Sequence, residues 1–73
     1  MILVNYKKLG QACKKFRSEK LNKTQIDVAN ETALTISAIS MFENGHSKST
    51  TILLWYIAKG MSVNNLIKCI EEV

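Results

Sequence analysis

Residues 24–45, TQIDVANETALTISAISMFENG, constrain the fold of this chain more than any other stretch. Thr24 is a typical N-cap residue, and Asp27 follows at the position that completes a capping box. Thr35 can cap a second helix, and Gly45 is a natural C-terminal stop. The pattern therefore predicts two short helices, over about residues 25–31 and 36–44. Roughly four residues separate them, which is the spacing of a helix-turn-helix.

The same stretch places small and apolar residues where two crossing helices need them. Ala29 supplies a small residue where the second helix approaches the first, and Leu34 supplies an apolar plug after the turn. Ile39 and Phe42 share one face of the second helix and are expected to point inward. Each feature is common alone, but the combination favours a helix-turn-helix.

The rest of the chain shows helical periodicity and no strand pattern. Apolar residues at helical intervals predict a first helix over about residues 5–20 and a fourth over about residues 51–59. Ser62 caps a fifth helix, which carries an apolar stripe of Val63, Leu66, Ile67, Ile70 and Val73. A chain of 73 residues forms one domain, so the fold class expected is all-α: a compact five-helix bundle over residues 1–73.

The apolar stripe of the fifth helix is wider than one side of a small core requires. Leu66 or Ile67 can pack inward, which leaves residues further along the stripe near solvent. We therefore expect a homodimer through this helix, with an interface of Val63, Leu66, Ile70 and Val73. The alternative is that the whole stripe serves a single core.

The charge of the chain is unevenly distributed. The net charge is +4, and basic residues gather in the first third of the sequence. There, Glu19 alone opposes Lys7, Lys8, Lys14, Lys15, Arg17, Lys20 and Lys23. A basic surface favours phosphate or an acidic protein as its partner, although the same residues can form an ordinary solvated helix face.

Few residues suggest chemistry. Cys13 and Cys69 fall at apolar helical positions and read as small core residues, and together with His46 they cannot complete a structural zinc site. We expect no metal, no cofactor and no enzymatic activity, because no catalytic constellation is present. No secretory signal precedes the cysteines, and the longest apolar run, ILLWYIA, is too short to span a bilayer. A cytoplasmic, nucleoid-associated protein of a bacterial or phage-infected cell is expected.

The helix pair resembles the motif of the phage-repressor and Cro family of helix-turn-helix proteins. The residues that carry the resemblance are Thr24-Gln25, Val28-Ala29, Leu34, Ile39-Ser40, Phe42-Glu43 and Gly45. The register needs no gap, and the similarity extends from about Leu9 to Lys68. Ala33 stands where the family usually has glycine, Ser49 where it often has proline, and the link between the fourth and fifth helices looks shorter. The resemblance implies a lambda-repressor-like fold.

The resemblance also implies which residues would touch DNA. Base edges in the major groove would be met by Ile36, Ser37, Ser40 and Met41. Phosphates would be met by Arg17, Thr24, Gln25, Asn44, His46, Ser47 and Lys48. Glu43 is expected to hold structure by pairing with Arg17.

The function expected from the resemblance is a small transcriptional regulator that binds operator double-stranded DNA as a homodimer. The second helix of the motif lacks the long polar side chains that give strong bidentate readout of bases. Serines and apolar side chains would then read DNA together with phosphate contacts and DNA shape. The alternative is an antirepressor or adaptor that binds another regulatory protein through Ile36, Met41 or the stripe of the fifth helix.

Overall fold

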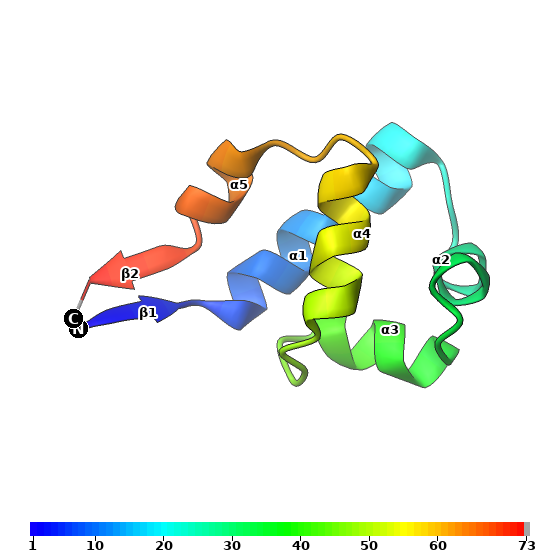
Figure 1. Ribbon diagram of the computed structural model, residues 1–73, viewed down its shortest axis with the longest axis horizontal. Coiled ribbons are helices and arrows are strands. Elements are labelled where there is room, and N and C mark those ends of the chain that lie inside the picture. The colour runs from blue at the N-terminus through cyan, green and yellow to red at the C-terminus, as the bar shows by residue number, and fades with distance from the viewer. Residues whose placement is uncertain (73) are drawn as a thin grey trace.

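The computed structural model describes residues 1–72 and shows a mostly helical chain with one small sheet. The elements in chain order are β1 (Ile2–Val4), α1 (Tyr6–Phe16), the π-helical segment η1 (Arg17–Leu21), α2 (Gln25–Thr32), α3 (Ile36–Glu43), α4 (Thr50–Ala58), α5 (Val63–Ile67) and β2 (Ile70–Glu72). The two strands project from one side of the helical body, next to α5 (Figure 1). The prediction of a mainly helical fold is confirmed, and the prediction that the chain has no strand is wrong.

Polar side chains fix where the helices begin. Thr24 accepts from the backbone N–H of Asp27, and the Asp27 carboxylate accepts in return from the Thr24 N–H at 2.9 Å, so the predicted capping box is present. The backbone hydrogen bond from Thr24 also lowers the pKa of Asp27. Thr35 and Ser62 cap α3 and α5 as expected. Ser49 caps α4, which shows how this chain starts that helix without proline.

A short turn joins α2 to α3. Ala33 ends α2 in the left-handed conformation with φ of 57°, which costs a non-glycine residue about 1 kcal/mol. The backbone N–H of Leu34 donates to the carbonyl of Ala29 at 3.0 Å and closes the helix end. The Leu34 side chain, expected as a plug, is instead 36% exposed.

The core lies between α1, α2, α3 and α4. Its buried apolar residues are Leu9, Cys13, Val28, Ala29, Ile39, Phe42, Ile52, Tyr56, Met61 and Cys69. The prediction that both cysteines are core residues is confirmed. Burial raises the pKa of Cys13 to about 12, so its thiol is an unreactive packing group at neutral pH.

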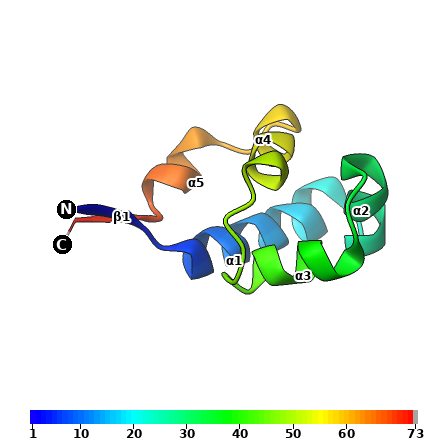
Figure 2. The same ribbon diagram turned by 60° about the horizontal axis from the view of Figure 1, so that its bottom comes forward.

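The helices α1 and α3 run side by side at very close range (Figure 2). Gly10 makes this approach possible, because a Cβ atom at that position would lie 2.4 Å from the carbonyl oxygen of Phe42. Gly45 follows α3 with φ of 80°, and a Cβ there would lie 2.8 Å from the Cα of Lys7. The two glycines thus set the distance between α1 and the C-terminal end of α3.

The C-terminal part of the chain departs most from expectation. The fifth helix ends at Ile67, and residues 70–72 form β2, which pairs antiparallel with β1. The predicted dimer stripe is therefore divided: Val63 and Leu66 lie on α5, Ile70 lies on β2, and Val73 is outside the described residues. Leu66 packs against the core while Val63 is exposed. A helical spacing of apolar residues cannot reveal a strand partner at the opposite end of the chain.

Candidate nucleic-acid interface

The third helix, α3, has an anchored inner face and an exposed outer face. Ile39 and Phe42 are buried in the core, as predicted. On the outer face, Ile36 and Met41 are 46% and 48% exposed, and Ser37 is also exposed. Of the four residues predicted to meet bases, Ser40 alone is half-buried; its hydroxyl lies 3.5 Å from the Asn44 amide nitrogen that donates to it. The outer face is thus short, uncharged and partly apolar.

A buried ion pair fixes the C-terminal end of α3. The Arg17 guanidinium donates from Nε to Glu43 Oε2 at 2.8 Å and from a terminal nitrogen to Glu43 Oε1 at 3.2 Å. Its other terminal nitrogen donates to the carbonyl of Lys23 at 2.9 Å. The expected pairing of Arg17 with Glu43 is confirmed, and the carboxylate raises the pKa of Arg17. This fork locks η1, the loop before α2 and the end of α3 together.

Arg17 is therefore misplaced in the predicted phosphate set. Only 8% of the residue is exposed, and Glu43 and Lys23 engage its guanidinium. The sequence predicts two roles for Arg17, a phosphate contact beside the surface lysines and a pair with Glu43, and the structure shows the pair. A phosphate could reach Arg17 only if the buried pair opened, which would leave the Glu43 carboxylate buried without its partner.

The same carboxylate orients Gln25 at the start of α2. The Gln25 amide donates from Nε2 to Glu43 Oε1 at 2.9 Å, and the side chain is half-buried. Thr24 precedes it on the surface, with its hydroxyl committed to the helix cap. Glu43 thus connects Arg17 and Gln25, so the first turn of α2 and the last turn of α3 form one rigid unit.

A loop follows α3 and carries the remaining predicted phosphate contacts. Asn44, His46 and Lys48 are exposed, and Ser47 is half-buried. The backbone N–H of His46 donates to the Met41 carbonyl at 2.8 Å, which holds the loop against the helix end. Lys48 Nζ lies 5.3 Å from the centroid of the Tyr6 ring, a cation–π contact that ties the loop to α1.

Helix α1 also contributes residues to this side: the sequence suggested that its lysines extend the phosphate contact, but it did not assign Gln11. Gln11 Nε2 donates to the Glu43 carbonyl at 3.3 Å, and the backbone of Lys7 borders Gly45. Lys14 is one further step along the same helical stripe and is exposed. The helical spacing of residues 7, 11 and 14 places them on one face of α1, but only the position of α3 shows that this face borders the candidate interface.

At the opposite end of the body, two lysines share one carboxylate. Lys23 and Lys59 both pair with the Glu31 carboxylate, Lys59 at 3.3 Å. The Lys23 contact is the larger cause of the lowered pKa of Glu31. The positive charge on the α1 and loop side is therefore less compensated than the charge around Glu31.

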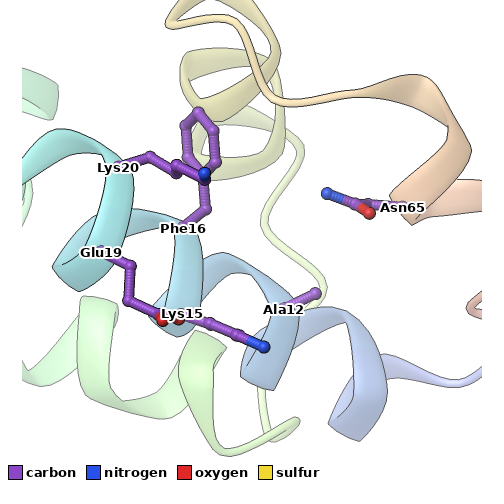
Figure 3. Close-up of a pocket in the computed structure, with 6 residues that line it drawn as sticks. All are labelled: Ala12, Lys15, Phe16, Glu19, Lys20 and Asn65. Carbon is purple, nitrogen blue, oxygen red and sulfur yellow. The ribbon is translucent and has the colours of Figure 1, made fainter.

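A cavity of about 560 Å³ opens between α1, η1 and α5 (Figure 3). Its lining residues are Ala12, Lys15, Phe16, Glu19, Lys20 and Asn65. It contains no cysteine or histidine, and within residues 1–72 no three metal-ligating side chains gather. In the same part of the chain, no helix has the length and hydropathy needed to cross a membrane.

Comparison with known proteins adds no relative. No protein-family model, curated protein or solved structure matches this chain. The functional interpretation therefore depends on the residues and their geometry.

Proposed function

We propose that this protein is a small sequence-specific DNA-binding regulator of the phage-repressor and Cro kind. In this proposal α2, the turn at Ala33 and α3 act as a helix-turn-helix in a lambda-repressor-like bundle, and α3 enters the major groove. The observation that carries the proposal is the exposed outer face of α3, held rigidly from behind by the Arg17–Glu43 pair and bordered by the exposed lysines Lys7 and Lys48.

Base readout in this proposal uses short side chains. Ser37 and Ser40 would hydrogen-bond to base edges with little selectivity, while Ile36 and Met41 would pack on thymine methyl groups. Such a helix gains less from direct readout than one with arginine or glutamine. Phosphate contacts and DNA shape would supply the remaining affinity and specificity.

The proposed phosphate contacts surround the ends of α2 and α3. Gln25, held by Glu43, would donate to a phosphate at the start of α2. Lys48 and its loop neighbours Asn44, His46 and Ser47 would meet the same strand, with Lys7 extending the contact from α1. A homodimer would bind a two-fold operator in the cytoplasm.

A second function is favoured by the apolar character of the same face. Ile26 and Leu34 are 55% and 36% exposed and belong to the α2–α3 segment that also presents Ile36 and Met41. An antirepressor or adaptor would use such side chains as anchors for another regulatory protein. The basic surface beside them favours DNA as the partner.

The salt dependence of DNA binding tests the main proposal. Binding of the purified protein to random and genomic duplexes is measured by fluorescence anisotropy over a series of salt concentrations. Lys7→Ala and Lys48→Ala should each weaken binding to all sequences and lower the salt slope by about one unit.

Lys15→Ala is the matched control, because Lys15 is on the same helix as Lys7 but lines the cavity that faces α5 (Figure 3). It should leave the slope nearly unchanged. Equal effects of Lys7→Ala and Lys15→Ala would mean that DNA binds by general charge alone. Absence of salt-dependent binding in the wild-type protein would eliminate the DNA proposal and favour the adaptor.

A further inference from the structure

The two-stranded sheet presents more apolar surface than an isolated pair of strands normally does. The register places Val4 opposite Ile70 and Ile2 opposite Glu72, so these side chains share one face. On that face Ile2, Val4 and Ile70 are 71%, 40% and 46% exposed. A two-stranded sheet by itself is only marginally stable in water.

The opposite face of the sheet is joined to α1. Leu3 and Glu71 are paired there, and the Glu71 carboxylate accepts from the Asn5 side chain at 2.7 Å. Lys8 Nζ lies 3.6 Å from the same carboxylate. These contacts hold the sheet in a fixed position, so its edges are presented in a defined direction.

Successive residues of a strand direct their backbone N–H and C=O groups to alternate edges, so one known hydrogen bond identifies which groups of β1 point outward. The Asn5 N–H donates to the Cys69 carbonyl at 2.7 Å, so Asn5 and, two residues earlier, Leu3 direct their polar groups toward β2. Ile2 and Val4 therefore direct their N–H and C=O groups toward the outer edge. No other strand among residues 1–72 pairs with that edge.

The two outer edges of the sheet differ in charge. The β2 edge has the sequence Ile-Glu-Glu, and antiparallel pairing of β2 with its own copy would bring glutamates together. The β1 edge has the sequence Ile-Leu-Val and carries no charge. With a two-fold axis at Leu3, Leu3 would stand opposite Leu3 of a second copy, and Ile2 opposite Val4 of that copy.

We propose that β1 pairs antiparallel with β1 of a second copy of this chain, forming a four-stranded sheet across a molecular two-fold axis. The outward N–H and C=O groups of Ile2 and Val4 then pair with those of the second copy, and Leu3 forms the central pair without hydrogen bonds. The apolar faces of the two sheets merge into one surface, on which Ile2 and Val4 pack against Val4 and Ile2 of the second copy, while Ile70 of each chain lies one strand further out.

This assembly rests on the proposed function only for its biological purpose, which is to supply the two-fold symmetry of an operator. It moves the dimer contact from the α5 stripe to β1, and Ile70 of the stripe supports β1 from the neighbouring strand of its own chain. Three residues per chain make an interface below the standard size of roughly 1,600 Å², so the dimer is expected to be weak and concentration-dependent.

Charge substitution at the two-fold axis tests the pairing by sedimentation velocity without DNA. Leu3→Lys places like charges opposite each other across the axis, while Glu71 on the same face of its own chain can pair with the new ammonium. Leu3→Glu also places like charges across the axis, but it adds repulsion from Glu71 of its own chain, so among the single variants Leu3→Lys is the decisive one. Each variant alone should associate at least about tenfold more weakly than wild type, and an equimolar mixture of the two should dimerise again.

Ile67→Lys is the matched control, because Ile67 is an exposed apolar residue on α5, away from β1. The Ile67→Lys variant should dimerise as the wild-type protein does. Circular dichroism verifies that each variant is folded. The proposal is overturned by a wild-type protein that stays monomeric at its highest soluble concentration, by Leu3→Lys protein that still dimerises, or by a mixture that stays monomeric. Because no DNA is present, these outcomes are independent of the salt-dependence test.

Discussion

Gly10→Ala should destabilise this protein, although the same change in an ordinary helix stabilises. Within a helix, replacing glycine by alanine gains roughly 0.5–1 kcal/mol. At Gly10 the new Cβ would lie 2.4 Å from the carbonyl oxygen of Phe42 and 2.5 Å from that of Glu43. Both neighbours are backbone atoms, so relief requires α1 and α3 to separate.

The expected magnitude follows from these opposing effects. Overpacking a well-packed site costs about 1–3 kcal/mol, and rigid backbone neighbours place Gly10 at the upper end of that range. After the helix-propensity gain, a net loss of about 1–2 kcal/mol remains. For a domain of this size the loss corresponds to a fall in Tm of roughly 5–15 °C.

Thermal unfolding followed by circular dichroism measures this loss, with Gly60 as the reference site. Gly60 has φ of 101° and nothing within 4 Å of a Cβ position, so Gly60→Ala is strained only in its backbone. Replacement by serine then separates the two causes: Gly10→Ser should be worse than Gly10→Ala, whereas Gly60→Ser should equal Gly60→Ala. An unchanged or raised Tm for Gly10→Ala would refute the close contact between α1 and α3.

Three further substitutions test the core and the outer face of α3. The Tyr56 hydroxyl is buried beside Arg17 and has no hydrogen-bond partner among residues 1–72, and burial raises its pKa. Because no hydrogen bond is lost, Tyr56→Phe should change the free energy of unfolding in urea by less than about 1 kcal/mol. A loss above about 1.5 kcal/mol would instead show that the hydroxyl bonds the guanidinium. Ser37→Ala should lower the preference for specific over random DNA by roughly 1 kcal/mol in anisotropy titrations and leave random binding unchanged. Met41→Ala should cost less at the operator; if Ser37→Ala is silent while Met41→Ala abolishes capture of a protein partner, the adaptor function is correct.

The elements that the sequence predicts well are those determined locally. The helices from residue 25 to residue 58 begin at capping side chains, and α3 and α4 end near Gly45 and Gly60. Their predicted bounds differ from the observed ones by about one residue. The pairing of Arg17 with Glu43 followed from a family resemblance and is present. The outer residues of α3 followed from the inward phase of Ile39 and Phe42.

The features that the sequence did not reveal depend on distant parts of the chain. Whether Arg17 faces DNA or the core is decided by a carboxylate 26 residues away. The strand at Ile70 forms because β1 is there to pair with it, and the helical spacing of Val63, Leu66 and Ile70 masked this outcome. The role of Gln11 became visible only when α3 was placed beside α1.

The pairing of β1 with β2 has a consequence for how the chain folds. The contact between Leu3 and Glu71 closes a loop that includes almost the whole sequence, whereas each helix forms from residues only a few positions apart. Closing a long loop has a large entropic cost, which is recovered only when the segments between its ends are already compact. The helical body is therefore expected to assemble first and the sheet last, and local unfolding should begin at the sheet. A dimer built on β1 would make completion of the fold depend on protein concentration.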